Sequence, residues 1–167
     1  FLGVFLLVAF VRAEGIITTI AGGGKFQVTG IGGLAANVPL GRIQGVATDP
    51  QGNVYVSDAA DLIVVKISTA GVLTIVVGNG SYGLDGDDGP AINASLSSPG
   101  ALATDTIGNL YIADGNRVRK VTPQGVISTV AGNPSACSPS HGCYSGDGGP
   151  AISAAIALVI PLSKLKF

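Results

Sequence analysis

The carboxylates that recur along this 167-residue chain are its first candidates for chemistry: Asp49, Asp58, Asp105 and Asp114. An aspartate can act as a general acid or base, or bind a metal ion. Here the first two occupy the same places in one sequence repeat that the last two occupy in the next. A catalytic group is needed once, whereas a turn is needed in every repeat. We therefore expect these carboxylates to accept backbone N–H bonds in turns.

The residues around them support a structural role. Asp-Pro-Gln-Gly-Asn at 49–53 and Asp-Thr-Ile-Gly-Asn at 105–109 have the composition of tight turns, because glycine and asparagine tolerate positive φ. The same structural assignment therefore extends to Gly52, Asn53, Gly108 and Asn109.

A second group of carboxylates lies in one glycine-rich stretch and consists of Asp85, Asp87 and Asp88. Oxygen ligands in a flexible loop suit Ca²⁺, so calcium is the one cofactor that the sequence suggests. The spacing is not that of an EF-hand, and the related stretch 30–35 has no acid. Asx turns that stabilise the loop are the alternative. Asp147 is the counterpart in a third copy of the stretch.

The two cysteines, Cys137 and Cys143, enclose Ser-Pro-Ser-His-Gly. In an exported protein they can close a small disulfide loop, and the alternative is two unrelated reduced thiols. His141 lies between them. Two cysteines and one histidine leave a zinc site one ligand short, so we predict no metal there.

Several function classes find no support in the sequence. The only histidine is in that cysteine loop, and no nucleophile–base constellation or phosphate-binding loop is visible. The net charge is −1 and there is no basic run, which argues against nucleic-acid binding.

The elements that must position these residues form a repeat. Gly-Asn-Val-Tyr-Val-Ser-Asp at 52–58 recurs as Gly-Asn-Leu-Tyr-Ile-Ala-Asp at 108–114. A chain with 47% hydrophobic residues, 11% charged residues and 26 glycines favours an all-β fold. Each repeat reads as four short antiparallel strands joined by tight turns. Pro90 and Pro150 each begin a single helical turn beneath a long loop.

Four-stranded units in tandem predict a β-propeller. Four strings carry a closer resemblance: Gly-Asp-Gly-Gly-Pro-Ala at 146–151, Asp-x-x-Gly-Asn-Leu-Tyr-Ile-Ala-Asp at 105–114, Asn-Arg-Val-Arg-Lys-Val at 116–121 and Ile-Ser-Thr-Val-Ala-Gly at 127–132. Together they resemble the NHL repeat, in the variant common in secreted bacterial proteins and similar to that of the extracellular teneurin propeller. The resemblance covers about 16–155.

The resemblance implies a six-bladed ring closed by an N-terminal strand, the place that 16–21 would take. The chain contains two full blades, at about 44–78 and 100–132, within a partial propeller at 14–155. Residues 1–13 read as the remnant of a signal peptide, with a buried first strand as the alternative. Residues 156–167 read as a divergent or truncated tail.

Two blades alone leave strand edges and apolar faces uncovered. We therefore expect further blades or self-association to cover them, and expect the polypeptide by itself to aggregate or form oligomers. The apolar run at 1–11 is too short for a stable membrane span.

The sequence favours a binding function over catalysis. It predicts a non-enzymatic protein that is secreted, periplasmic or on the cell surface, and that binds protein or glycan through the long loops at 78–99 and 132–155. The alternative is a fragment of a propeller enzyme, lyase- or lactonase-like, with a metal in its central channel. A structural module of a larger surface protein is a third possibility.

Overall fold

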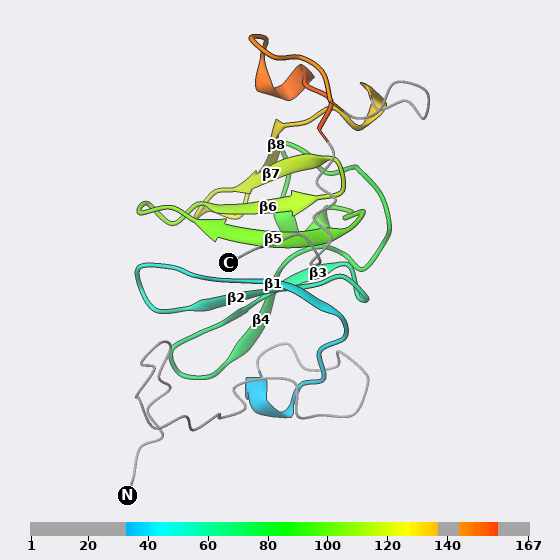
Figure 1. The fold of residues 1–167 in the computed structure, drawn as a ribbon. Coiled ribbons are helices and arrows are strands. Elements are labelled where there is room, and N and C mark those ends of the chain that lie inside the picture. Colours follow the sequence, from blue (N-terminus) through cyan, green and yellow to red (C-terminus); the bar gives the residue numbers. More distant parts are fainter. Residues whose placement is uncertain (1–32, 137–143, 157–167) are drawn as a thin grey trace, which may run out of the picture.

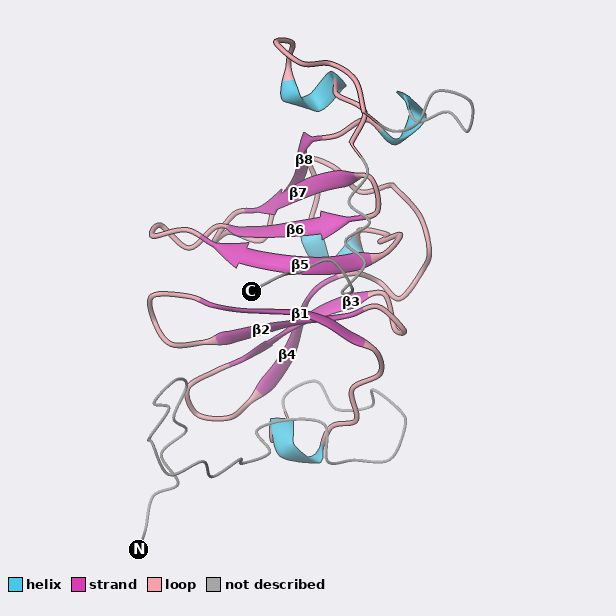
Figure 2. Ribbon diagram, viewed as in Figure 1, coloured by secondary structure: helices cyan, strands magenta, loops and turns pink. Residues whose placement is uncertain are grey.

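The structure is a computed structural model that describes residues 33–136 and 144–156. It contains two four-stranded antiparallel sheets in which strand order follows chain order (Figure 1). The first sheet comprises β1 (Ile43–Thr48), β2 (Val54–Asp58), β3 (Ile63–Ile67) and β4 (Leu73–Val77). The second comprises β5 (Pro99–Thr104), β6 (Leu110–Asp114), β7 (Arg117–Val121) and β8 (Ile127–Ala131). Short 3₁₀ turns are η1 (Ala35–Asn37), η2 (Ala91–Asn93), η3 (Pro134–Ala136) and η4 (Ala151–Ser153) (Figure 2).

Three loops connect these elements and are named here by position. The first loop (33–42) precedes the first sheet, the second loop (78–98) joins the sheets, and the third loop (132–156) follows the second sheet. The described part of the third loop is 132–136 and 144–156. The 3₁₀ turns all lie in these loops.

The two sheets have the same register. Tyr55 of β2 lies opposite Lys66 of β3, and Tyr111 of β6 lies opposite Lys120 of β7. The strands are rich in valine and isoleucine, which fit a pleated and buried surface. The third strand of the first sheet begins at Ile63, because Leu62 adopts a φ of 55° and ends the preceding turn.

The sheets meet along their innermost strands, β1 and β5, which lie side by side (Figure 1). A Cβ atom on Gly45 of β1 would lie 2.3 Å from the backbone oxygen of Gly100 in β5. The Ser57 hydroxyl donates a 2.7 Å hydrogen bond to the same oxygen, and Thr104 donates one of 2.6 Å to the Thr48 carbonyl. Small side chains are therefore required where the sheets are closest.

Two apolar clusters form the core. One lies between the sheets and includes Val64, Val77, Leu96 and Ile112, all fully buried. The other lies on the opposite face of the first sheet, where the first loop covers it. Both faces of the first sheet are therefore buried, as expected when sheets stack side by side in a propeller.

The all-β fold of propeller type is confirmed, with two four-stranded antiparallel sheets in the described chain. The 16–21 strand, the leader at 1–13 and most of the tail at 156–167 lie outside the described residues. None of the described helices is long and apolar enough to cross a membrane.

Candidate functional site

The turn carboxylates Asp49 and Asp105 lie at one end of the inner strands. Together with Thr48, Pro50, Thr104 and Thr106 they line an open hollow of about 510 Å³. In the first sheet Asp49 accepts hydrogen bonds from the backbone N–H groups of Gln51 and Asn53, at 3.0 and 2.9 Å. In the second, Asp105 accepts them from Ile107 and Asn109, at 3.1 and 2.8 Å. Each carboxylate thus holds its own turn.

Side chains complete both turns in the same way. The Asn53 amide and the Tyr55 hydroxyl donate to Asp49 at 2.7 and 3.2 Å. Burial works against the charge, but these bonds from Asn53 and Tyr55 hold the pKa of Asp49 below its usual value. Burial and the nearby Asp49 charge raise the pKa of Tyr55 to about 12. The lowered pKa makes Asp49 a weak proton acceptor, and both of its oxygens already accept hydrogen bonds from its own turn.

The second sheet repeats this arrangement at its exposed turn. Asn109 donates to Asp105 at 2.6 Å, and Tyr111 donates at 3.2 Å. The Asn109 amide is the main cause that holds the pKa of Asp105 below its usual value. The two turns therefore have the same hydrogen-bond pattern around Asp49 and Asp105.

The strand-end carboxylates Asp58 and Asp114 are fully buried at the opposite end of the sheets. Asp58 accepts N–H bonds from Ala60 and Asp61 in the following turn, as the sequence predicts, and also from Arg42 in the first loop. Asp114 also accepts bonds from the loop before its sheet, from Ser97 N–H at 2.7 Å and Ser98 N–H at 2.8 Å, and it pairs with Arg117 of β7. These aspartates therefore tie each sheet to its preceding loop.

The acidic stretch of the second loop folds back on the second sheet. Asp87 accepts a 2.7 Å ion pair from Arg119 and a 2.6 Å hydrogen bond from the Thr129 hydroxyl. Burial opposes ionisation, but Thr129 and Arg119 hold the pKa of Asp87 below its usual value. Asp85 contributes its backbone oxygen to Arg119 at 3.3 Å, and Asp88 adopts a φ of 62°.

These contacts bear on whether Asp85, Asp87 and Asp88 could bind calcium. Within residues 33–136 and 144–156, no group of three or more histidine, cysteine, aspartate or glutamate side chains is placed to hold a metal ion. Asp87 already has a cation partner, and Asp85 and Asp88 are exposed. A calcium site would require Asp87 to leave Arg119.

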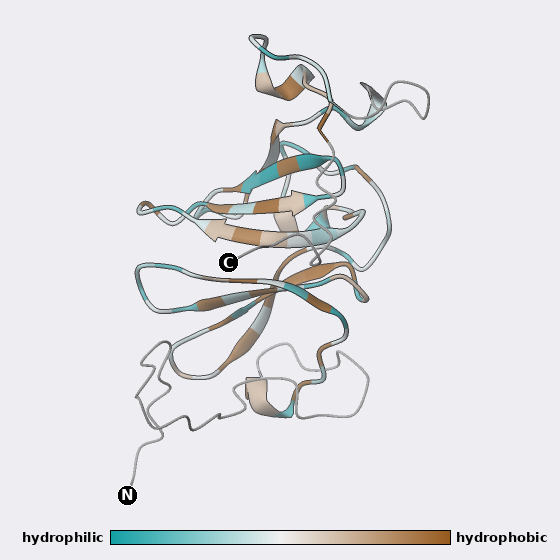
Figure 3. Ribbon diagram, viewed as in Figure 1, coloured by the Kyte–Doolittle hydropathy of each residue, from teal (hydrophilic) through white to brown (hydrophobic). Residues whose placement is uncertain are grey.

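Two arginines, Arg117 and Arg119, occupy alternate positions of β7. Both are buried and paired: Arg117 with Asp114 at 3.1 Å, and Arg119 with Asp87. The corresponding residues of β3 are apolar, so Figure 3 shows β3 in brown and much of β7 in teal. The sequence signal that could have predicted this ion pair is that Asp87 and Arg119 occur together in one repeat, while the other repeat has neither charge.

Other sequence candidates fall outside the description. Cys137, His141 and Cys143 lie in the segment 137–143, so the predicted disulfide stays a prediction.

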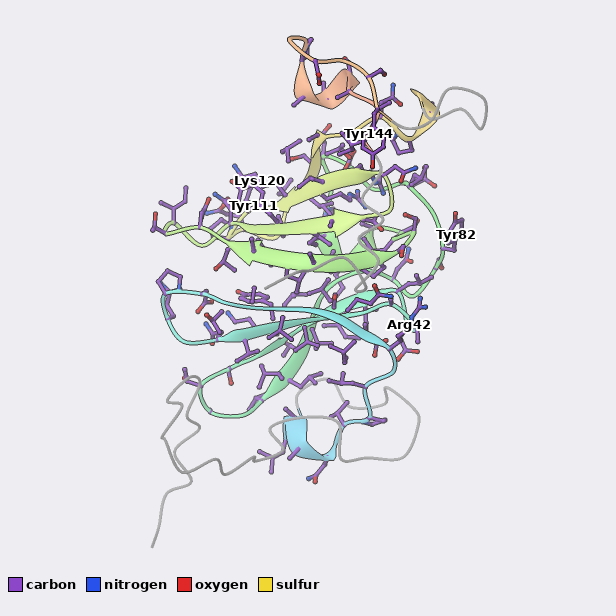
Figure 4. The ribbon with its side chains drawn as sticks, in the orientation of Figure 1. Arg42, Tyr82, Tyr111, Lys120 and Tyr144 are labelled. Atoms are coloured by element: carbon purple, nitrogen blue, oxygen red, sulfur yellow. The ribbon has the colours of Figure 1, made fainter. Side chains whose placement is uncertain are left out.

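The exposed aromatic side chains of the described residues lie on two of the loops. Tyr82 of the second loop is 78% exposed and Tyr144 of the third loop is 81% exposed. Figure 4 shows both on the loops, at the other end of the strands from the turn that precedes Tyr111. Leu84, Ile92 and Ile152 are also exposed along these loops. This set, Tyr82, Leu84, Ile92, Tyr144 and Ile152, is called the loop surface below.

The chain resembles known proteins over part of its length. Residues 84–145 match the family model described as the Teneurin NHL domain. Over 102 residues, 53% of this chain, the sequence is 37% identical to Teneurin-3 of Mus musculus and 33% identical to Teneurin-4 of Homo sapiens. The match spans about 4% of the length of each relative.

A solved structure shares the fold. A protein of unknown function from Bacteroides thetaiotaomicron superposes with a TM-score of 0.53 at 20% identity, covering 70% of this chain and 40% of that one. The NHL character of the repeats, predicted from their strings, is confirmed by the family model and the teneurin matches.

Proposed function

We propose that this chain is part of an exported NHL-repeat propeller that binds a protein partner through its loop surface. The observation that carries the proposal is the exposure of Tyr82 and Tyr144, at 78% and 81%, on successive loops at one end of the sheets. Tyrosine is enriched in protein interfaces because it offers a large apolar ring with a polar tip.

The loops that present these tyrosines are held in place. In the second loop, Asn79 N–H donates to Ala94 C=O at 3.0 Å and Leu96 N–H donates to Ser81 C=O at 3.3 Å. The Asn79 side chain also accepts the Ser81 N–H at 2.8 Å. A pre-ordered loop loses less conformational entropy on binding, which favours a recognition role.

The similarity to the Teneurin NHL domain covers 84–145, which includes Tyr144 but begins after Tyr82. The extracellular setting implied by the NHL resemblance supports an exported location for this chain. A glycan ligand is the other outcome that the test below distinguishes.

Catalysis in the central channel is the weaker alternative. A channel metal would need ligands at the ends of the inner strands, where this chain offers Asp49 and Asp105. Both carboxylates already accept bonds from their own turns. Binding therefore fits the described side chains better than metal-assisted chemistry.

The test compares the full chain with two variants. Biotinylated full-length chain is cross-linked to a cell-surface protein extract, and the captured species are quantified before and after enzymatic removal of glycans. We expect the unaltered chain to capture a protein both before and after glycan removal. The double variant Tyr82→Ala/Tyr144→Ala should lose this capture, and Ile107→Ala should keep it. Ile107 is the matched control because it is 74% exposed at the opposite end of the sheets.

Equal capture by both variants would place binding elsewhere and overturn the proposal. Loss of capture on glycan removal would assign the surface to a glycan instead of a protein.

A further inference from the structure

Each loop is joined by its backbone to the outer hairpin of the sheet that follows it. In the second loop, Ala91 N–H donates to Gly125 C=O at 2.7 Å, and Ile127 N–H donates to Gly89 C=O at 3.0 Å. Gly125 and Ile127 belong to the β7–β8 hairpin. The first loop makes the same bonds to the β3–β4 hairpin: Ala35 N–H to Gly71 C=O at 2.8 Å, and Leu73 N–H to Gly33 C=O at 3.0 Å.

The third loop already has the shape of the second. Gly146 has a φ of 99°, against 98° for Gly86. Pro150 has φ and ψ of −62° and 131°, against −61° and 125° for Pro90. The bond back to the preceding sheet is also present, because Gly132 N–H donates to Ala151 C=O at 2.9 Å. Residues 146–154 of the third loop are therefore preformed.

Its outward groups have no partner in the described chain. Ala151 N–H and Gly149 C=O correspond to the groups of Ala91 and Gly89 that bind the second sheet, and neither makes a hydrogen bond within residues 33–136 and 144–156. Asp147 corresponds to Asp87, is exposed, and has no ion pair there. Three groups that bind a sheet in the second loop are thus presented to solvent in the third.

The side chains at this contact are matched loop by loop. Asp87 meets Arg119 and Thr129, which lie opposite each other on β7 and β8. The equivalent pair in the first sheet is Val65 and Ile75. In the sequence, the stretch 30–35 that precedes the first sheet has Ile31, which lies outside the described residues, at the place of Asp87. In the sequence, an aspartate at this place therefore precedes a sheet with Arg and Thr, and an isoleucine precedes one with Val and Ile.

We propose that residues 146–151 are the docking site for a further four-stranded sheet of the same repeat, and that Asp147 selects a sheet with arginine and threonine at the positions of Arg119 and Thr129. The incoming hairpin contributes a turn carbonyl to Ala151 N–H and a strand N–H to Gly149 C=O. Its arginine forms a salt bridge with the Asp147 carboxylate.

The selection follows from desolvation. A sheet with valine at the Arg119 position would partly desolvate Asp147 without giving it a cation or a donor, which weakens docking, since Asp87 is 36% exposed in the equivalent contact. An apolar residue in place of Asp147 would likewise leave an incoming arginine without its carboxylate. The partner is therefore recognised by charge as well as by shape.

The test appends a candidate sheet to the intact chain. A second copy of residues 97–132 is joined after Phe167 through a flexible glycine–serine linker, which gives a high effective concentration. Amide hydrogen exchange is then followed at Ala151. We expect docking to slow exchange of this amide by about tenfold or more relative to the chain without the copy.

Two matched changes test the selection. Arg119→Val and Thr129→Ile, made only in the appended copy, should abolish the protection of Ala151. Adding Asp147→Ile to that same molecule should restore it. The amide of Ala91, bonded to Gly125 of the unaltered second sheet, serves as the internal measure of folding.

Either of two results would overturn the inference. One is an Ala151 exchange rate that the appended sheet does not change. The other is equal protection by the Arg–Thr and Val–Ile copies, which would show that Asp147 selects nothing.

Discussion

Arg119 and Asp87 form a 2.7 Å ion pair in which the arginine side chain is completely buried and the aspartate side chain is 36% exposed. The two residues are 32 positions apart, one on a strand and one on a loop. The guanidinium also donates to the Ser95 carbonyl at 3.0 Å, while its Nε has no partner in the described chain. The pair attaches the acidic loop to the second sheet.

Removal of one partner tests this attachment. Arg119→Ala should lower the free energy of unfolding by about 3 kcal/mol, because it leaves Asp87 without its cation and a cavity behind it. Urea denaturation measures the change. Lys120→Ala on the same strand is the control and should change it by less than about 0.5 kcal/mol. Similar losses for both variants would contradict a special role for Arg119.

The contact between the inner strands predicts an asymmetry between two glycines. Gly45→Ala should lower stability by about 2 kcal/mol or more, because its Cβ would lie 2.3 Å from the backbone oxygen of Gly100. Gly100→Ala should change it by less than about 1 kcal/mol, because the nearest atom to its Cβ would be the Ala113 oxygen at 3.5 Å. Chemical denaturation of the two variants measures which one loses more stability. A larger loss for Gly100→Ala than for Gly45→Ala would refute the prediction.

The Ser57 hydroxyl links the sheets and should also matter. Ser57→Ala removes the 2.7 Å bond from the fully buried Ser57 hydroxyl to the half-buried Gly100, so we expect a loss of about 1–2 kcal/mol. Thr104→Val removes the other link at a more exposed position and should have a smaller effect. Thermal unfolding followed by circular dichroism compares them. The idea fails if Ser57→Ala is as stable as the parent.

Acid should destabilise the turns. The folded-state pKa of Asp49 lies below its ordinary value of 3.8, so its contribution is present above that value and disappears as the pH falls through the lowered pKa. Asp105 acts in the same direction. Asp61 acts in the opposite direction, because burial and the neighbouring Asp58 raise its pKa. The melting temperature should therefore be flat above about pH 5 and fall below about pH 4.

The variant Asp49→Asn isolates the first of these contributions. It should be less stable at neutral pH and lose less stability on acidification than the parent. Parallel melting curves at each pH provide the measurement, and identical acid slopes would show that Asp49 does not contribute.

Tyr55 provides an independent view of the same turn. Burial and the Asp49 charge raise its pKa to about 12, so its tyrosinate absorbance should appear only in strong alkali. Asp49→Asn removes the charge and should move this titration to lower pH, while Asp105→Asn, near Tyr111, should leave it unchanged. The Tyr55→Phe difference spectrum assigns the signal. An unchanged Tyr55 titration in Asp49→Asn would show that the Asp49 charge does not raise the pKa of Tyr55.

Local pattern was sufficient to predict the architecture. The repeated Gly-Asn-x-Tyr string places a turn and a strand in each repeat, and Tyr55 and Tyr111 lie at equivalent registers in the two sheets. The turn and the strand each depend on residues that are close in sequence, so the spacing of those residues is enough to predict them.

Burial of charge was harder to predict, because it depends on distant contacts. Arg119 and Lys120 are adjacent on β7, yet one is fully buried and the other only partly. The difference arises because the second loop folds over one face of the strand, and nothing within β7 specifies that. The exposure of Tyr82 has the same origin, since loop conformation determines which residues reach solvent.

The backbone bonds of the loops also govern how the molecule unfolds. Ala91 uses its carbonyl for Gly78 at the end of the first sheet and its N–H for Gly125 in the second. When one sheet unfolds, Ala91 loses one of its two backbone hydrogen bonds, and the other bond is then less well fixed. Unfolding should therefore spread from sheet to sheet through nearest-neighbour coupling, as in a one-dimensional array, with these peptide groups adding to the coupling made by the apolar cluster between the sheets.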